Sequence, residues 1–263
     1  MEQDGATHGS RYDASVAQTY DQTRGWGAAI PEFIVEACGL AASSRLLDLA
    51  CGTGNLAAAI RSICPCPTTG VDASEDMLTL ARRKLPEATF VCADVAALPF
   101  PDGRFDCEAG SFFLHHLSPA GGAACVREAY RVLGAGSLAI VTLSHAQIEK
   151  CSLGRFFPEV IEIDKGRFPP VPDVLEWYRR AGFEEIKESV VMDRPSVVNE
   201  RLLHAAERRF VSTLAMIEPR ALERGLDRIR EAIRTGAASA APLPAPRTIL
   251  TGRKRARATT GRV

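Results

Sequence analysis

The stretch LLDLACGTGN, Leu46–Asn55, decides the fold. It begins within a short apolar strand, Arg45–Ala50, which carries one acid at Asp48, and it continues into a turn with two glycines. The alanine- and leucine-rich segment 55–60 then favours a helix. A strand, a glycine turn and a helix in succession bring backbone amides close to a nucleotide-like ligand. The stretch therefore predicts a nucleotide-type binding site and leaves the ligand open.

Outside this stretch, segments typical of strands alternate with segments typical of helices. The predicted strands are 68–72, 89–93, 105–111, 138–143, 185–191 and 247–251, and the predicted helices are 74–85, 118–133, 172–181, 202–214 and 222–233. Gly134-Ala135-Gly136 predicts a helix end. The segment 235–246, rich in small residues and proline, predicts a loop. The alternation indicates an open, mostly parallel α/β sheet with helices on both faces.

Composition excludes several classes of protein. A chain of 263 residues with 46% apolar residues supports one large domain with a real core. Lys+Arg and Asp+Glu both number 32, so the zero net charge gives no reason to expect nucleic-acid binding. We expect a cytoplasmic chain without a signal peptide or membrane span. The eight cysteines lack a CxxC pair and are expected to be free thiols, with no metal site.

Acids follow the predicted strands at one edge of the sheet. Ligands of such sheets bind at the carboxyl ends of the strands. Asp72 ends the second strand about 20 residues after the glycine turn, where an acid accepts hydrogen bonds from ribose hydroxyls. Asp94 follows the third strand and suits an exocyclic amine, and the amide of Val95 suits a ring nitrogen. This set of residues predicts an adenosine site.

The glycine turn fits a dinucleotide poorly. The G-x-G-x-x-G fingerprint places glycines against a pyrophosphate, whereas this turn reads Ala50-x-Gly52-x-Gly54 with Ala57 in the last position. Asp48 would repel a pyrophosphate, but it would suit orienting the loop or attracting an ammonium group. An NAD(P)-dependent oxidoreductase on a related fold stays open as an alternative.

Five segments in order carry a family resemblance. They are LLDLACGTG at 46–54, VDASEDM at 71–77, CADVAALPF at 92–100, the segment 105–117 with LHHL, and the segment 128–136. Their series resembles the class I S-adenosylmethionine-dependent methyltransferases over roughly 46–191. Within that class the chain is most similar to the ubiquinone- and menaquinone-biosynthesis type (methyltransferase type 11) of small-molecule enzymes. The resemblance implies a Rossmann-like, doubly wound, seven-stranded sheet, mostly parallel with an antiparallel last strand.

The resemblance also implies S-adenosyl-L-methionine as cofactor. The glycine turn would line its methionine part, Asp72 its ribose, and Asp94 with Val95 its adenine, while an aromatic ring at Tyr20 would close over the sulfonium. The implied cofactor-binding residues are Tyr20, Asp48, Ala50, Gly52, Gly54, Asp72, Ala73, Met77, Asp94, Val95, Gly110 and Ser111. Two departures are Ala50 in place of the first glycine, and 134–136, where relatives often have a proline.

Methyl transfer requires an acceptor aligned in line with the methyl group and protected from water. A hydroxyl acceptor also needs a base, for which His115, His116 and His145 are candidates beside the crevice, whereas a carbon or amine acceptor needs none. The segment 145–171 contains three phenylalanines, Phe156, Phe157 and Phe168. With the helices of 192–246 it is expected to form a lid, in which these aromatics would either line an apolar acceptor site or pack the lid's own core.

The sequence thus predicts a methyltransferase that transfers a methyl group to O, N or C of a small molecule, with secondary metabolites and quinone-like compounds as candidates. The expected division is 1–44 helical cover, 45–191 cofactor-binding core, 192–246 lid, 247–252 final strand and 253–263 basic flexible tail. A monomer or homodimer is expected. Besides the oxidoreductase, a cofactor-binding protein without turnover and a methyltransferase of RNA or protein remain alternatives.

Overall fold

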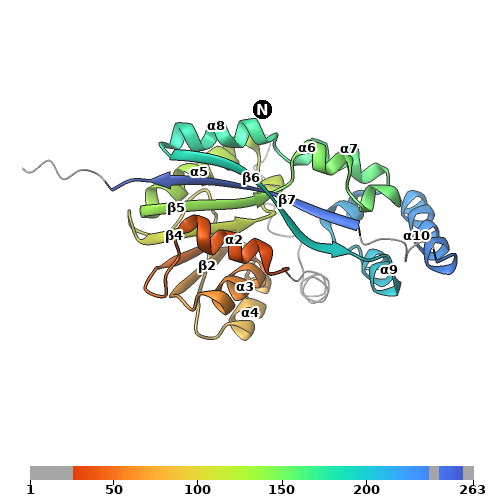
Figure 1. Cartoon of the computed structure of the whole chain (residues 1–263), viewed down its shortest axis with the longest axis horizontal. Coiled ribbons are helices and arrows are strands. Elements are labelled where there is room, and N and C mark those ends of the chain that lie inside the picture. Colours follow the sequence, from red (N-terminus) through yellow and green to blue (C-terminus); the bar gives the residue numbers. More distant parts are fainter. Residues whose placement is uncertain (1–25, 237–242, 257–263) are drawn as a thin grey trace, which may run out of the picture.

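A computed structural model describes residues 26–236 and 243–256, and its strands form one seven-stranded sheet in the order β3-β2-β1-β4-β5-β7-β6 (Figure 1). The strands are β1 Leu46–Leu49, β2 Thr68–Asp72, β3 Thr89–Cys92, β4 Phe105–Ser111, β5 Leu133–Thr142, β6 Glu184–Ser196 and β7 Leu243–Lys254. The first five strands in this order, from β3 to β5, run parallel to one another. Strand β7 is antiparallel to both of its neighbours, β5 and β6. The predicted doubly wound sheet with an antiparallel last strand is confirmed.

Helices cover both faces of the sheet. One face carries α2 Ala29–Cys38, α3 Asn55–Ile63 and α4 Glu75–Lys84, and the other carries α5 Pro119–Val132 and α8 Val171–Ala181 (Figure 1). Ile30 and Ile34 of α2 are fully buried against apolar residues of β1 and β4. Helix α2 falls within the range predicted as a cover, but it packs as a layer of the core.

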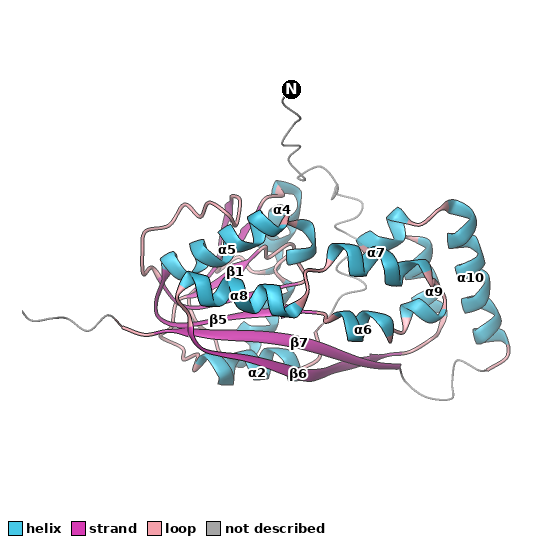
Figure 2. Ribbon diagram, turned by 90° about the horizontal axis from the view of Figure 1, so that it is seen from above, coloured by secondary structure: helices cyan, strands magenta, loops and turns pink. Residues whose placement is uncertain are grey.

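The remaining helices gather beyond one end of the sheet and form a unit that we call the helical lid (Figure 2). It contains α6 His145–Glu149, η3 Leu153–Arg155, α7 Glu159–Arg167, α9 Glu200–Glu207, η4 Ser212–Met216 and α10 Pro219–Arg234. Phe157 from the first insertion and Leu214 and Ile229 from the second lie in one buried cluster. The two predicted insertions therefore share a single core. Within 26–236 and 243–256, no helix combines the length and apolar character that a bilayer crossing requires.

The last two strands are longer than predicted. β6 and β7 continue as a two-stranded ribbon past the sheet, with Met192 opposite Pro246 and Asp193 opposite Ala245. The prolines that predicted a loop lie where β7 has a neighbour on one side only, a position that tolerates a residue without an N–H. At the other end, Lys254 belongs to β7 rather than to a flexible tail, and its Nζ donates to Tyr130 O at 2.6 Å.

Helix α5 ends directly before the glycines of 134–136, as predicted, and these glycines lie inside β5. Helix α5 passes directly into β5 at Leu133. A Cβ on Gly136 would stand 1.9 Å from the carbonyl oxygen of Asp106, on the neighbouring strand. Gly136 is thus required by the close approach of two strands.

The helix predicted over 202–214 is interrupted. Helix α9 ends at Glu207, Arg209 adopts a left-handed backbone with φ 52°, and the chain resumes as the short η4. The apolar periodicity of the segment reflects burial of Leu203, Phe210 and Leu214 in the lid core, and that burial does not require a continuous helix.

Candidate active site

The glycine turn between β1 and α3 is built from left-handed residues. Ala50, Gly52 and Gly54 have φ values of 49°, 53° and 76°. Gly54 precedes the first residue of α3, so the loop reverses the chain directly onto a helix N-terminus. Glycine adopts this conformation without a steric penalty, whereas Ala50 is strained by its Cβ.

This strain makes Ala50→Gly a stabilising change. We expect the free energy of unfolding to rise by about 0.5–1 kcal/mol, because relief of the left-handed strain exceeds the added entropy of the unfolded chain. Urea unfolding measures the difference. Ala59→Gly, inside α3, is the matched control and is expected to lower stability by about 1 kcal/mol. Equal losses in the two variants would contradict the strain at Ala50.

Asp48 is a buried acid beneath this loop. It is 1% exposed, and its Oδ2 accepts a hydrogen bond from the backbone N–H of Ala57 at 3.1 Å. Burial raises the pKa of the Asp48 carboxyl to about 8, since the Ala57 bond compensates only in part and Asp72 adds a like charge. The hydrogen bond from Ala57 N–H to Asp48 joins α3 to β1 beneath the glycine loop.

Asp72 is held at the end of β2 by two backbone donors. Its Oδ2 accepts from Gly52 N–H at 2.8 Å, and its Oδ1 accepts from Ser74 N–H at 2.9 Å. Burial raises the pKa of the Asp72 carboxyl, and these N–H groups oppose that rise. Ser74 also caps α4, as predicted, by accepting from Met77 N–H at 3.4 Å. The carboxylate is therefore fixed against the glycine loop.

Asp94 and Val95 follow β3 on the loop toward β4. Asp94 is exposed, and its Oδ1 accepts from Ala96 N–H at 2.8 Å. The side chain of Val95 is buried in the main core, which leaves its backbone amide as the group suited to a ligand.

Two residues of α5 fix this loop, and the sequence reasoning missed their role. Glu128 Oε2 accepts from Leu98 N–H at 2.9 Å. Arg131 donates to the carbonyl oxygens of Leu98 at 2.9 Å and Phe100 at 2.7 Å, and it pairs with Glu128 at 2.8 Å. The spacing of three residues between an acid and a base on a predicted helix was the available signal. This spacing did not indicate that both side chains also bind the loop between β3 and β4.

An aromatic cluster at the end of β4 was also missed. Phe112, two residues after Gly110, has a left-handed φ of 50° and stacks on Trp26 at 5.8 Å between ring centroids. The guanidinium of Arg247 lies 5.5 Å from the centroid of the Phe112 ring. The cluster beside Ser111 thus combines a residue from the segment before α2, the residue that follows β4 and a residue of β7. No local sequence pattern relates these three positions.

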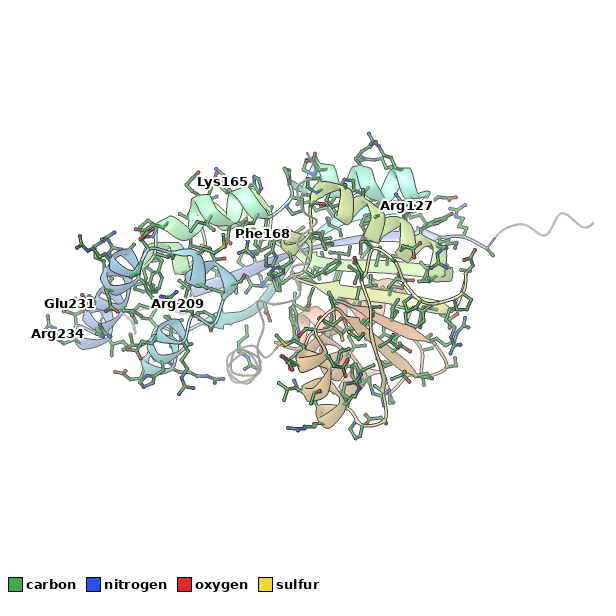
Figure 3. The ribbon with its side chains drawn as sticks, turned by 180° about the vertical axis from the view of Figure 1, so that it is seen from behind. Arg127, Lys165, Phe168, Arg209, Glu231 and Arg234 are labelled. Carbon is green, nitrogen blue, oxygen red and sulfur yellow. The ribbon has the colours of Figure 1, made fainter. Side chains whose placement is uncertain are left out.

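The three candidate histidines lie near Phe168. His145 Nε2 is 2.9 Å from the carbonyl oxygen of Phe168, and because a carbonyl only accepts, Nε2 donates. The His115 ring lies 4.3 Å from the Phe168 ring at 14°, and 4.0 Å from the His116 ring. Figure 3 shows Phe168 where the helical lid meets the sheet. His145 therefore joins the start of α6 to the end of α7, and the His115 ring contacts the rings of Phe168 and His116.

The sheet order β3-β2-β1-β4 places the predicted cofactor residues on adjacent strand ends. This set comprises Asp48, Ala50, Gly52, Gly54, Asp72, Ala73, Asp94, Val95, Gly110 and Ser111. Met77 is only 4% exposed, so its side chain packs in the interior, and Tyr20 lies outside the described residues. Phe156 and Phe157 pack the core of the helical lid, so of the two expectations for them the packing role is the one observed.

Comparisons with known proteins give the class. Residues 46–136 match the family model of a methyltransferase domain. Over 105 residues the chain is 40% identical to the demethylmenaquinone methyltransferase of Thermus thermophilus, covering 38% of this chain and 47% of the relative. Over 118 residues it is 37% identical to a ubiquinone/menaquinone biosynthesis C-methyltransferase of Pseudomonas putida, covering 41% and 45%. The chain thus spans about half the length of these curated relatives.

A solved structure supports the fold. A protein from Anabaena variabilis, assigned as a methyltransferase of an antibiotic biosynthesis pathway, superposes with a TM-score of 0.75 at 18% identity. The match covers 89% of this chain and 100% of that chain, and at such low identity it shows the fold alone.

Residues 46–136 therefore match a methyltransferase domain, and the sheet around them has the fold of a solved methyltransferase structure. The chain's sequence relatives are of the ubiquinone/menaquinone-biosynthesis type, which confirms the resemblance seen in the sequence.

Proposed function

We propose that the whole chain transfers the methyl group of S-adenosyl-L-methionine to O, N or C of a small molecule. The observation that carries the proposal is the Asp72 carboxylate, which two backbone N–H groups fix beside the left-handed glycine loop. A carboxylate held in this way keeps lone pairs for ribose hydroxyls. The match of 46–136 to a methyltransferase domain favours this reading over an oxidoreductase.

The individual roles belong to the same proposal. The loop Ala50–Gly54 would hold the methionine part, Asp94 and the Val95 amide the adenine, and Gly110 or Ser111 the amino acid end. Asp48 would act by orienting the loop, since it is buried and bound to Ala57 N–H. Tyr20 would cover the sulfonium. When bound, the cofactor supplies an activated methyl group, and the chain's residues supply alignment and exclusion of water.

The acceptor would lie at the carboxyl ends of β4 and β5, under the helical lid. Because His145 donates to Phe168, we propose it as a positioning residue for the lid, and His116 or His115 as the base where the acceptor needs one. A small-molecule acceptor rather than a nucleic acid agrees with the zero net charge. A monomer or homodimer and a cytoplasmic location complete the proposal.

Calorimetric titration with S-adenosylmethionine, S-adenosylhomocysteine and NAD tests the cofactor assignment. We expect the first two to bind with one site per chain and NAD to give no saturable heat. Binding of NAD without the other two would overturn the proposal. Binding without methyl transfer across a broad panel of phenols, amines and quinols would instead support a cofactor-binding protein without turnover.

Cys92 provides an independent test of the site's position. It is exposed, it ends β3 in register with Asp72, and its Sγ lies 3.6 Å from Ala73 O. We expect S-adenosylhomocysteine at about ten times its Kd to slow alkylation of Cys92 about tenfold, because only the free protein would react. Peptide mass spectrometry measures the rate, with half-buried Cys151 in the helical lid as an internal control. Unchanged alkylation of Cys92 at saturating ligand would place the site elsewhere.

A further inference from the structure

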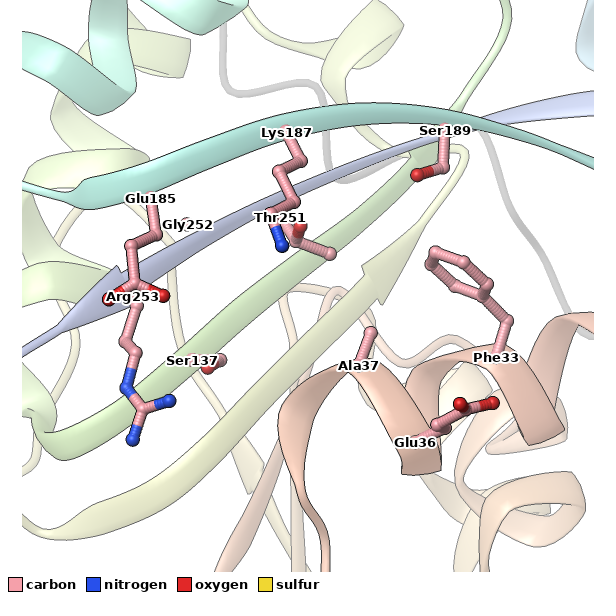
Figure 4. A pocket seen from close by; sticks show the side chains of 10 residues that line it. All are labelled: Phe33, Glu36, Ala37, Ser137, Glu185, Lys187, Ser189, Thr251, Gly252 and Arg253. Carbon is pink, nitrogen blue, oxygen red and sulfur yellow. The ribbon is translucent and has the colours of Figure 1, made fainter.

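A cavity that is separate from the candidate active site lies away from the carboxyl ends of the parallel strands. It has a volume of about 430 Å³ and lies between α2 and the β5–β7–β6 part of the sheet (Figure 4). Its lining residues are Phe33, Glu36, Ala37, Ser137, Glu185, Lys187, Ser189, Thr251, Gly252 and Arg253. None of them belongs to the candidate active site. The cavity therefore calls for its own explanation.

The strand register concentrates hydrogen-bond donors on its floor. Arg253 of β7 lies opposite Ser137 of β5, and Lys187 of β6 lies opposite Thr251 of β7. Thr251 and Arg253 are two residues apart, so they face the same side of the sheet. Directly opposed residues have Cβ atoms about 5 Å apart, and diagonal ones about 7–8 Å. Two cations and two hydroxyls thus share one patch, which Figure 4 shows from above the sheet.

These donors lack partners within the part of the chain that the structure describes. Neither Lys187 nor Arg253 forms an ion pair or a side-chain hydrogen bond there. Ser137 and Thr251 are only 8% and 9% exposed, and their hydroxyls make no hydrogen bond in the same range. Arg255, which directly follows β7, differs from these residues, because it pairs with Glu184 and Glu185 at 3.0 Å. Ser137 and Thr251 both line the cavity, so their hydroxyls can donate to a ligand that enters it.

We propose that this cavity binds a small organic molecule through a phosphate group. Arg253 offers a planar fork of donors, Lys187 a point charge, and Ser137 and Thr251 neutral donors, a set that matches phosphate oxygens. The cavity falls in the size range of small-molecule sites and exceeds the needs of a phosphate alone. Phe33 and Ala37 of α2 provide an apolar wall for the organic part, and Glu36 on the same helix provides an acceptor.

The lining carries two cations, Lys187 and Arg253, and two acids, Glu36 and Glu185. The acids lie apart from the donor patch, because Glu36 belongs to α2 and Glu185 pairs with Arg255 at 3.0 Å. An anion would therefore bind through the two cations and the two hydroxyls on the strand floor. This site is independent of the proposed function, because it shares no residue with the cofactor site.

Titration calorimetry with phenyl phosphate and with inorganic phosphate tests the proposal on the full chain. We expect saturable binding of phenyl phosphate with a Kd of about 1 mM or below, and weaker binding of inorganic phosphate, which cannot contact Phe33. The double variant Lys187→Ala/Arg253→Ala is expected to bind phenyl phosphate at least about tenfold more weakly. Arg180→Ala removes an exposed cation of α8, which lies on the other face of the sheet, and it should bind like the wild type.

A neutral variant separates a built site from general charge attraction. Ser137→Val keeps both cations and removes one buried donor, so a real site should lose about threefold to tenfold in affinity. Thermal unfolding midpoints establish that each variant is folded. The proposal is overturned if phenyl phosphate gives no saturable heat at about 10 mM, or if the double variant binds as tightly as Arg180→Ala.

Discussion

Replacing Asp72 with alanine is expected to weaken S-adenosylhomocysteine binding by at least about 30-fold. The carboxylate is the proposed acceptor for the ribose hydroxyls, and each charge-assisted bond contributes about 1.5–3 kcal/mol. The change also removes the acceptors for Gly52 N–H and Ser74 N–H, so the glycine loop loses its support. Titration calorimetry of the purified variant measures the loss.

Two further variants separate these effects. Asp72→Asn keeps one oxygen as an acceptor for the loop but removes the charge, so we expect a loss of about tenfold. Asp173→Asn alters an exposed acid in the first turn of α8 and should bind as the wild type does. Wild-type affinity in Asp72→Ala would refute the ribose role, and equal losses in all three variants would indicate a global effect.

Replacing Glu108 with glutamine is expected to change how stability depends on pH. Glu108 lies in the middle of β4, is fully buried, and neither carboxyl oxygen has a hydrogen-bond partner among the described residues. Burial raises its pKa well above the ordinary value, although the charges of Lys254 and Arg131 oppose this. The folded chain therefore retains the Glu108 proton to a higher pH than the unfolded chain does.

The sign follows from proton linkage. Above the unfolded pKa of Glu108 the unfolded chain binds fewer protons, so the wild type's free energy of unfolding falls by about 1.4 kcal/mol per pH unit. Glutamine does not titrate. As pH rises from about 5.5 to about 7.5, the wild type should lose stability relative to Glu108→Gln, by at most about 3 kcal/mol, because the slope holds only up to the folded pKa.

Urea unfolding at both pH values measures this relative loss. Glu188→Gln on β6 changes an exposed acid and should follow the wild type at both pH values. If the wild type and Glu108→Gln lose stability in parallel, Glu108 is ionised in the folded chain and the prediction is wrong.

Much of the sheet and the cofactor side of the site was predictable because the information is local. The glycine loop, Asp72 and Asp94 each follow a strand directly, and strand ends of a parallel sheet meet at one edge. The capping role of Ser74 follows from its position before an acidic first turn. Burial, pKa shifts and loop support are not local, so the raised pKa of Asp48 and the role of Arg131 required coordinates.

The failures share a physical cause in long-range contacts. The sequence pattern indicates the helix end before Gly136 but not the close approach of Asp106, and the prolines of β7 indicate a loop until β6 provides a partner strand. Arg209 ends α9 through a left-handed backbone that sequence pattern does not indicate. The stack of Trp26 on Phe112 joins segments that are far apart in the chain.

The ribbon of β6 and β7 has a consequence for how such a chain can diverge. Its two strands stay paired up to Ser196 and Leu243, so the chain leaves and re-enters the ribbon at adjacent positions. Whatever lies between can be exchanged, lengthened or reduced to a hairpin turn without disturbing the sheet. The helices carried there share a core with the insertion around Phe157, so the two insertions would change together, while strands β1 to β4 stay the same. This agrees with a family match that covers only residues 46–136.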